Sequence, residues 1–289
     1  MGNDSVNTRK YSVSNDRFYT PESTVSQLIG LVDMDDYENI IEPSAGDGAI
    51  LHRLPNRAVG YDLEPHSSDI QPMNWLEPTD AEGNHDDAMY IADKAFHWSF
   101  GKTLVIGNPP FGRQGSLASR FFNEAASFAD TIAFIMPKSY MKDSMMNRLE
   151  HHFHIDTIVP VVDDHYRIPG GTRVVPTVII VAHRERSTRK DHIIVNHVDM
   201  SSLPFVFTNH DDADYMVIRV GGNSGALASM DAVTDKNKKY NYFIKITDDS
   251  VDIQELFSKA QQRLHVMRDM TTGPRSISKN ELVDAIMSV

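Results

Sequence analysis

The chain contains no cysteine among its 289 residues. That absence excludes disulfide bonds and every zinc site built on thiolates. It also excludes reactions that need a cysteine nucleophile, of which carbon-5 methylation of a pyrimidine is one. The only tempting metal cluster is His151, His152 and His154, and because adjacent side chains on a helix point in different directions, we expect no metal site there.

Long apolar runs are missing as well. No segment approaches the 18 or more apolar residues that a membrane-spanning helix needs, and Met1 to Ser5 lacks an apolar signal region. Neither a membrane span nor export is therefore expected. The sequence predicts an intracellular protein, in a bacterial or phage-infected cell.

Positive charge is scarce: 28 Lys and Arg face 40 Asp and Glu, which gives a net charge of −12. Phosphate contacts from Lys and Arg usually dominate affinity for nucleic acid, so such a partner would have to meet local basic patches. Three candidates are Arg184 to Lys190, Lys236 to Lys239, and Arg275 to Lys279. Each patch alone is more often a solvated surface.

The most informative motif is Asn108-Pro109-Pro110-Phe111, which follows the apolar run Thr103 to Gly107. The exocyclic amine of adenine and the amide of glutamine are poor nucleophiles, because the nitrogen lone pair is delocalised. The Asn108 oxygen and the Pro109 carbonyl could each accept one amine proton, which turns the lone pair towards a methyl donor. The two prolines make a rigid turn, and Phe111 could lie on a planar substrate.

A small-residue loop lies about sixty residues upstream, in Asn39 to Leu51. It reads as a short strand, a loop with Gly46 and Gly48, and the first turn of a helix. Glycines there allow positive φ and close approach of a ligand to the backbone. No Gly-Lys-Ser/Thr follows, so the loop is not a phosphate-binding P-loop.

The next predicted strand, Ala58 to Tyr61, ends in Asp62. An acid at this place commonly meets the ribose hydroxyls of a cofactor, and a solvated strand-end acid is the alternative. Thr20, directly before Pro21, is a candidate for the N-cap of a helix that opens at Pro21.

In these motifs and in their order, the chain resembles the amino-methyltransferases that use S-adenosylmethionine and carry an Asn-Pro-Pro-Phe or Asn-Pro-Pro-Tyr signature, with the cofactor half first. The resemblance implies that a Phe-x-Thr-Pro segment closes over the cofactor's methionine carboxylate and that Leu63 packs on its adenine. An Asp usually found beside that adenine is replaced here by Asn74, so Asp69 or an acid between Asp80 and Asp87 could serve instead. The implied cofactor residues are Tyr19, Thr20, Pro21, Glu42, Ser44, Ala45, Gly46, Asp62, Leu63, Asn74 and Asn108.

The remaining periodicity predicts an α/β fold with a Rossmann-like sheet of about seven mostly parallel strands and helices on both faces. Apolar residues at helical spacing predict a helix over Ser116 to Ala129, followed by a buried strand over Thr131 to Pro137 and by a polar loop and helix over Lys138 to His152. The last two sheet strands are expected at Ile155 to Val162 and at Val174 to Ala182.

Residues 1–184 are expected to form the catalytic domain, and residues 185–289 a smaller recognition lobe. The lobe pattern predicts strands at Ile193 to Val198, Tyr215 to Val220 and Tyr240 to Ile246, a helix over Ser250 to Arg268, and a final helix.

Substrate contacts are expected from four residues. In the resembling family, a loop like Asp163 to Arg173 supplies an aromatic residue, so Tyr166 could sandwich the target base against Phe111, although a surface hairpin is equally possible. Arg275 and Lys279 suit a phosphate loop, and a linker to the final helix would have the same composition.

The resemblance implies methyl transfer from S-adenosylmethionine to the 6-amino group of adenine in DNA, catalysed by Asn108, Pro109, Pro110 and Phe111. Adenine in RNA, the 4-amino group of cytosine and glutamine in a protein remain open, as does a non-catalytic module that binds nucleic acid or a partner. No nuclease motif is present, so an orphan or phage enzyme is as plausible as half of a restriction-modification system.

Overall fold

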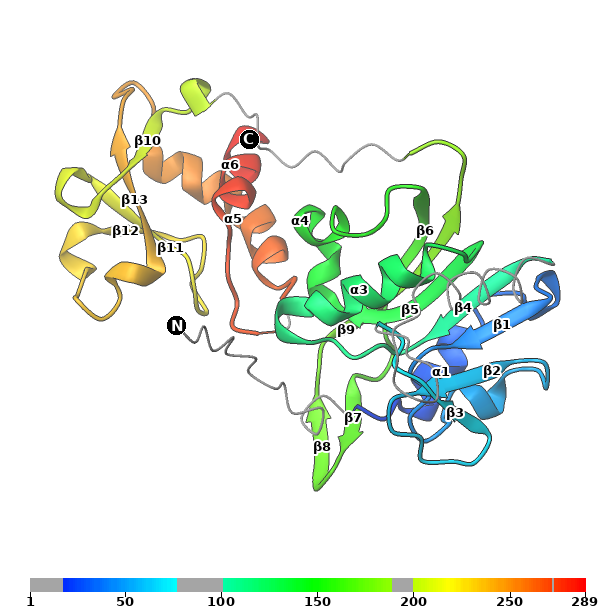
Figure 1. The fold of residues 1–289 in the computed structure, drawn as a ribbon. Helices are drawn as coiled ribbons and strands as arrows, with labels where there is room; N and C mark the ends of the chain where they lie inside the picture. The colour runs from blue at the N-terminus through cyan, green and yellow to red at the C-terminus, as the bar shows by residue number, and fades with distance from the viewer. Residues whose placement is uncertain (1–17, 77–100, 189–199, 272) are drawn as a thin grey trace, which may run out of the picture. The chain divides into compact units, whose positions relative to one another are not determined.

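The computed structural model describes residues 18–76, 101–188, 200–271 and 273–289 (Figure 1). These residues form two compact units. The first holds the described residues up to Met136 together with Val161–Val175 and Ile179–Arg184, and the second holds Pro137–Pro160, Pro176–Val178 and Glu185–Val289. Among the described helices, none is both long and apolar enough to cross a membrane.

A seven-stranded sheet has the order β3-β2-β1-β4-β5-β9-β6. Its strands are β1 (Asn39–Glu42), β2 (Val59–Asp62), β3 (Ile70–Pro72), β4 (Thr103–Gly107), β5 (Thr131–Pro137), β6 (Phe153–Pro160) and β9 (Thr177–Arg184). The pairs β1–β2, β2–β3, β1–β4 and β4–β5 are parallel. This is a Rossmann-like α/β fold, as predicted from the sequence.

The strand order reverses at β1, which lies between β2 and β4. β4 and β5 are buried along their whole length, which explains their continuous apolar sequence. In open α/β sheets, ligands bind outside the carboxyl ends of the strands at such a reversal. A ligand site is therefore expected at the loops that follow Glu42, Asp62 and Gly107.

The helices predicted over Ser116 to Ala129 and within Lys138 to His152 are shorter than predicted. α1 spans Glu22–Ile29, and α3 spans Ser116–Ala125 and packs on β5 through an edge contact between Phe122 and Phe134, with ring centroids 6.3 Å apart. The predicted helix to Ala129 thus ends four residues early. Between Lys138 and His152 only α4 (Asp143–Met146) follows a 3₁₀ turn, because the polar segment has no continuous apolar stripe.

The expected helix after the glycine loop is only a 3₁₀ turn, Leu51–Arg53. Gly46 and Gly48 have φ of 55° and 82°, in the left-handed region that the sequence predicted for them. The φ of Gly48 is one that L side chains rarely adopt, so the loop depends on glycine there.

A second sheet, of four strands in the order β10-β13-β11-β12, lies in the second unit. Its strands are β10 (Phe205–Thr208), β11 (Tyr215–Ile218), β12 (Leu227–Ser229) and β13 (Asn241–Ile246), all paired antiparallel. α5 (Ile253–Arg268) and α6 (Lys279–Met287) complete its core.

The predicted strands in 215–220 and 240–246 and the helix before Arg268 are present in this unit. β10 and β12 were not predicted, because four and three residues are too few to show a period. The predicted strand Ile193 to Val198 lies outside the described residues.

Candidate functional site

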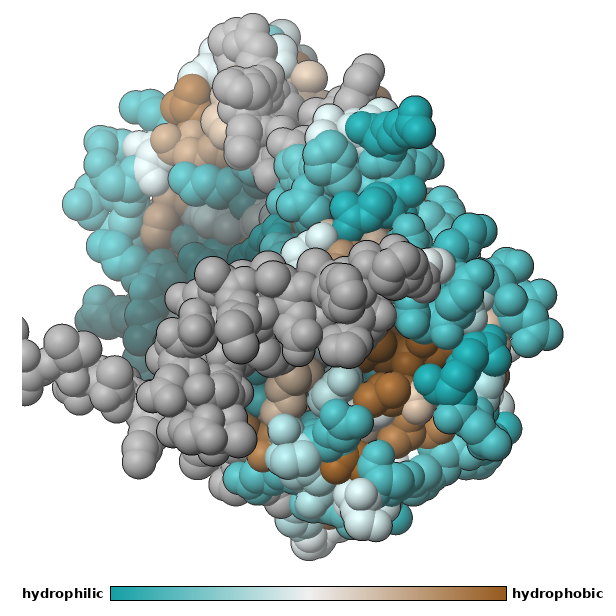
Figure 2. All heavy atoms as spheres, turned by 45° about the vertical axis from the view of Figure 1, so that its right-hand side comes forward, coloured by the Kyte–Doolittle hydropathy of each residue, from teal (hydrophilic) through white to brown (hydrophobic). Residues whose placement is uncertain are grey.

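A cavity of about 320 Å³ opens at the carboxyl ends of β1, β2 and β4, within the range of small-molecule sites. Figure 2 shows hydrophobic residues gathered among hydrophilic ones on the face turned forward. The cavity is lined by Phe18, Tyr19, Pro43, Ser44, Gly46, Asp62, Leu63, Glu64, His66, Met73, Asn74, Trp75, Leu76, Asn108, Pro109, Pro110, Leu117 and Phe121. The structure thus brings together the glycine loop, the strand-end acid and the Asn-Pro-Pro turn.

Asn108 is held in one orientation by its amide nitrogen. The Nδ2 atom donates to the Phe18 carbonyl at 3.3 Å and to Thr20 Oγ1 at 3.1 Å. Because a carbonyl can only accept, the side-chain oxygen must lie on the other side. That oxygen, Oδ1, is buried and has no hydrogen-bond partner. Asn108 therefore offers an unsatisfied acceptor at the edge of the cavity.

Asp62 fixes the glycine loop. Its two carboxylate oxygens accept from the backbone N–H of Gly46 and of Glu64, each at 2.8 Å. Ala45 N also donates to the Tyr61 carbonyl at 2.8 Å, and Ser44 Oγ donates to the Asn108 carbonyl at 3.1 Å.

The cavity lining includes an apolar side chain, Leu63, and an amide side chain, Asn74. Leu63 is 51% exposed, although leucine is usually buried, and it lines the cavity. Asn74 also lines it, and its Oδ1 accepts from Leu76 N at 3.3 Å. Both side chains line the cavity, and their contacts with a cofactor adenine remain predictions. The alternative acid Asp69 is not part of the lining, and Asp80 to Asp87 lie outside the described residues.

Glu42 ends β1 and is only 1% exposed, with Oε2 lacking a hydrogen-bond partner. The pKa of Glu42 is raised to about 8, chiefly because burial disfavours the charged carboxylate. The Leu51 backbone hydrogen bond lowers this pKa, and the nearby Asp62 and Asp47 carboxylates contribute to raising it. At neutral pH this carboxyl is therefore largely protonated.

The segment Phe18 to Thr20 joins the hairpin of β7 (His165–Ile168) and β8 (Gly171–Val174). Tyr19 N donates to the Arg167 carbonyl at 2.9 Å, and Arg167 N donates to the Tyr19 carbonyl at 3.2 Å. The Arg167 side chain forms an ion pair with Asp47 of the glycine loop. These contacts link the β7–β8 hairpin to the Thr-Pro segment and to the glycine loop.

Thr20 does not cap α1, which was one of its two predicted roles. Pro21 is the N-cap residue, with φ of −61°, and no side chain caps the helix there. The Thr20 hydroxyl instead accepts from Asn108 Nδ2.

The aromatic residues differ from the predicted sandwich. Phe111 is 7% exposed and stacks on Phe18, with centroids 5.9 Å apart and an interplanar angle of 18°. Tyr166 is fully buried and meets the Phe18 edge at 6.1 Å. Phe18, rather than Phe111 or Tyr166, lines the cavity. No role was predicted for Phe18, because its position in the Phe-x-Thr-Pro pattern is the only signal of it in the sequence.

Arg275 and Lys279 lie in the second unit and do not line this cavity. Arg275 pairs with Asp269 at 2.6 Å, and the Lys279 ammonium lies 4.6 Å from the centre of the Phe207 ring. Both side chains are exposed.

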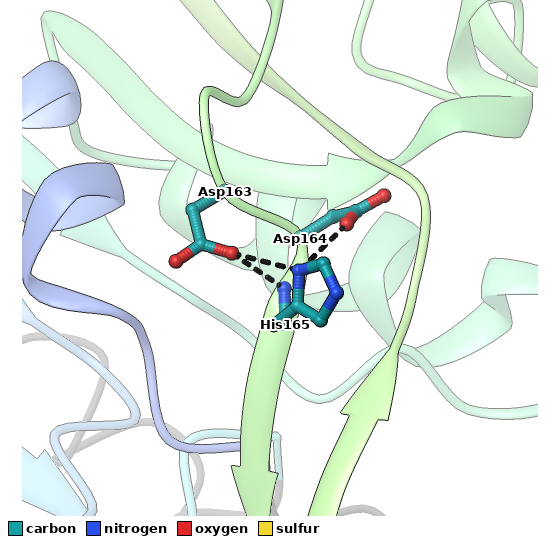
Figure 3. A group of neighbouring side chains, drawn as sticks. All are labelled: Asp163, Asp164 and His165. Atoms are coloured by element: carbon teal, nitrogen blue, oxygen red, sulfur yellow. Dashed lines mark hydrogen bonds and ion pairs between the residues drawn. The ribbon is translucent and has the colours of Figure 1, made fainter.

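Asp163, Asp164 and His165 form a cluster at the start of β7 (Figure 3). The His165 ring and backbone nitrogens both lie 3.0 Å from Asp163 Oδ1, which lowers the pKa of Asp163, chiefly through the backbone bond. These contacts close a turn, and the Thr24 hydroxyl donates to the Asp163 carbonyl at 2.6 Å. The cluster is therefore explained by local structure.

S-adenosylmethionine fits this donor set. A planar adenine suits the exposed Leu63, ribose hydroxyls suit Asp62, and the glycine backbone leaves room for an amino-acid end. The orphaned Asn108 Oδ1 stands beside the prolines, where a substrate amine could meet it.

No protein-family model matches the chain. An rRNA methyltransferase of Streptomyces thermotolerans is 28% identical over 118 residues, which are 40% of this chain and 38% of that protein. The match therefore spans well under half of that relative.

Two solved structures illustrate the structural similarity. A Pyrococcus horikoshii protein provisionally described as an RNA methyltransferase matches at 13% identity and a TM-score of 0.41, over 61% of this chain and 90% of that chain. The 23S rRNA methyltransferase ErmE matches at 11% identity and a TM-score of 0.38, over 94% and 98% of the two chains. Similarities at this level carry no argument about activity.

Proposed function

We propose that this chain is an S-adenosylmethionine-dependent N-methyltransferase that acts on the exocyclic amino group of a nucleic-acid base, with the 6-amino group of adenine in DNA as its target. The observation that carries this proposal is Asn108, whose Oδ1 is buried, oriented and without a partner beside the cavity. An unsatisfied buried acceptor costs about 1–3 kcal/mol, so a site retains it where a ligand supplies the donor.

In this proposal the cofactor lies across the carboxyl ends of β1, β2 and β4. Asp62 and Leu63 hold the ribose and adenine, Asn74 meets the adenine edge, and the Ser44–Gly46 loop accommodates the amino-acid end. Glu42, Ala45, Tyr19, Thr20 and Pro21 support that end of the site. When bound, S-adenosylmethionine supplies a methyl group on a sulfonium that is a good leaving group.

The chain's own contribution is to prepare the amine. Asn108 Oδ1 and the Pro109 carbonyl accept the two amine protons, which draws the lone pair out of conjugation. Pro110 keeps this turn rigid. No side chain has to remove a proton beforehand, because the methylated nitrogen is a much more acidic ammonium that loses its proton to water.

In this proposal the target base binds at the stacked rings of Phe18 and Phe111. In the observed arrangement Phe18 covers Phe111 at 5.9 Å, so a base reaches Phe111 only when the two rings part. The reacting amine is inaccessible inside a duplex, so the enzyme would act on an extruded base. Tyr166, at the Phe18 edge, would support the ring from behind rather than form a face of the slot.

Adenine in RNA is the second candidate, and the similarity to an rRNA methyltransferase favours it. Cytosine and protein glutamine share the chemistry, and a non-catalytic module differs because it need not bind the cofactor. We further propose that 1–184 carries the catalysis and 185–289 the target recognition, with Arg275 and Lys279 at phosphates. A partner subunit is compatible with each of these.

The test incubates the full chain with tritiated-methyl S-adenosylmethionine and, separately, unmethylated duplex DNA, mixed RNA or protein extract. Digestion of the labelled polymer then identifies the modified unit. Label in N6-methyl-2′-deoxyadenosine from DNA supports the first candidate, and label only in N6-methyladenosine from RNA replaces it by the second. Label in neither polymer, despite cofactor binding, contradicts the proposed reaction.

A further inference from the structure

A second cavity, of about 270 Å³, lies in the second unit beside β11 and β13. It is lined by Met216, Ile218, Val220, Asn237, Tyr240 and Asn241. Three of these are apolar, and Tyr240 adds an aromatic ring that is 46% exposed. We call this the lobe pocket.

The backbone brings three basic segments to the wall of the lobe pocket. Arg219 N donates to the Tyr240 carbonyl at 3.1 Å, which joins Arg219 to the end of the Lys236 to Lys239 segment. Gly221 N donates to the Arg275 carbonyl at 2.8 Å, and Val220 forms a bridge with Ser276. Segments more than fifty residues apart in the sequence therefore meet around Val220.

The cations near the pocket are exposed and lie against aromatic rings. The Lys239 ammonium is 5.0 Å from the centre of the Tyr240 ring, and the Arg219 guanidinium is 5.8 Å from that of Tyr242. Lys236, Lys238 and Lys239 are all exposed. The positive charge of Lys238 is partly offset by the nearby Asp211 carboxylate. Lys238 helps to lower the pKa of Asp211, after the larger effect of the His210 hydrogen bond. In a chain of net charge −12 this is a concentrated basic surface.

The lining also offers a polar group. Asn237 uses its side chain locally, accepting from Thr234 N at 2.8 Å and donating to the Ala232 carbonyl at 3.1 Å. Asn241 Nδ2 donates to the Asn237 carbonyl at 3.2 Å and lies 3.3 Å from Met216 Sδ, which fixes the orientation of that amide. Apolar side chains, an aromatic ring, side-chain amides and neighbouring cations are the features of a site for a single nucleobase with its phosphate.

We propose that the lobe pocket binds one unpaired nucleotide of the substrate nucleic acid, with its base stacked on Tyr240 and its phosphate among Lys239, Lys236 and Arg219. This inference rests on the proposed function, since it supplies that activity with a second point of contact on the polymer. A planar base has the shape that the ring and the apolar floor can cover together. Stacking on an aromatic side chain tolerates any base, so the pocket contributes affinity for exposed strands rather than sequence recognition.

The test is fluorescence anisotropy of the full chain with labelled single-stranded DNA, single-stranded RNA and duplex DNA of one mixed sequence. Tyr240→Ala is expected to weaken single-strand binding about 5-fold to 100-fold, the effect of losing one base–aromatic stack. Tyr240→Phe should keep the affinity within about twofold, because the ring face is retained. Lys239→Ala should reduce the slope of log K against log salt by about one.

A second readout follows the stacking itself. An oligonucleotide that contains 2-aminopurine should lose emission with the wild type and with Tyr240→Phe, and keep it with Tyr240→Ala. Lys259→Ala is the matched control, since Lys259 is exposed on α5 and pairs with Glu255 at 2.9 Å, away from the pocket lining. Circular dichroism confirms that each variant is folded.

Unchanged single-strand affinity in Tyr240→Ala would overturn the inference, as would a wild type that binds none of the three probes. Which probe binds best distinguishes DNA from RNA. Failure of the proposed function is a separate outcome, seen as absence of S-adenosylmethionine binding or of methyl transfer by the same preparation. A variant that loses strand binding but still binds S-adenosylmethionine like the wild type supports the lobe pocket alone.

Discussion

Asn108 and Glu42 of the first unit each have one buried side-chain oxygen without a hydrogen-bond partner, Oδ1 and Oε2 respectively, and the two groups differ in kind. Asn108 keeps its amide nitrogen bonded, so its free oxygen has one direction. Glu42 is a carboxyl that burial keeps largely protonated. One is a neutral amide oxygen, which we propose accepts from the substrate amine, and the other belongs to a titratable group with a raised pKa.

Replacing Asn108 by Ala should lower the turnover of methyl transfer about 100-fold or more, as for other preorganised groups that act on the transition state. The equilibrium dissociation constant for S-adenosylmethionine should change less than about threefold, because the side chain acts mainly on the amine. Turnover by single-turnover kinetics and binding by calorimetry measure the two effects. Asn123→Ala, an exposed amide on α3, is the control. Equal losses of binding and turnover would count against the assigned role.

Glu42 should make stability depend on pH. Its pKa is raised to about 8 in the folded chain from an ordinary value of 4.5, so between these two pH values the folded state holds a proton that the unfolded state has released. Stability from this group is therefore complete below pH 4.5 and falls as pH rises to about 8, by at most about 1.4 kcal/mol per pH unit.

Chemical denaturation of the wild type and of Glu42→Gln between about pH 5 and 9 measures this slope. The amide cannot ionise, so the difference in unfolding free energy should change with pH in favour of the variant as pH rises. Two parallel pH profiles would show that Glu42 does not titrate in this window.

At the scale of elements, the sequence predicted the parts that repeat or are continuous. β4 and β5 are unbroken apolar runs, and β13 and α5 are long enough to show a period. Gly46, Asp62 and Asn108 were placed at one site because their motifs follow strands that end at the same edge of a parallel sheet.

Other features depend on contacts between distant segments, which no local pattern shows. Phe18 stacks on Phe111 in a segment where Tyr19 pairs with Arg167 of β7 and Asn108 Nδ2 donates to the Phe18 carbonyl. The predicted Tyr166–Phe111 sandwich missed this stacking, since nothing in the sequence around Phe18 reveals a bridge to the hairpin. The lobe pocket is another case, because it joins segments around residues 219, 240 and 275.

The second unit should be stabilised by its helix caps independently of the cofactor site. Asp252 caps α5 by accepting from Gln254 N at 2.9 Å and Glu255 N at 3.0 Å. Asp252→Ala should therefore cost about 1 kcal/mol and lower Tm by a few degrees, measured by thermal denaturation. S-adenosylmethionine affinity should stay the same. The exposed neighbour Asp249→Ala should change neither quantity, and an equal fall in Tm there would remove the capping explanation.

At the scale of the whole molecule, the candidate cofactor cavity and the grouped cations are found in different units. The cavity with Asn108 lies in the first unit, while Arg219, Lys239, Arg275 and Lys279 lie in the second. An acidic chain can bind nucleic acid when its cations are grouped in this way, and the acids elsewhere limit nonspecific binding.

The double variant Arg275→Ala, Lys279→Ala should weaken binding of nucleic acid, and reduce the salt slope by about two if each cation meets a phosphate. Its affinity for S-adenosylmethionine should equal that of the wild type. Anisotropy titrations at several salt concentrations, with Lys259→Ala as control, measure the slope. An unchanged slope would show that these cations only cover Asp269 and Phe207.

The central claim is that the cavity at the carboxyl ends of β1, β2 and β4 is the cofactor site, and calorimetric titration of the full chain with S-adenosylmethionine tests it most directly. We predict one-to-one binding that Leu63→Asp weakens at least about tenfold, because a carboxylate replaces the apolar face under the adenine. Leu31→Asp, at an exposed leucine outside the cavity lining, should bind like the wild type. No binding by the wild type, or equal effects of the two substitutions, would contradict the account.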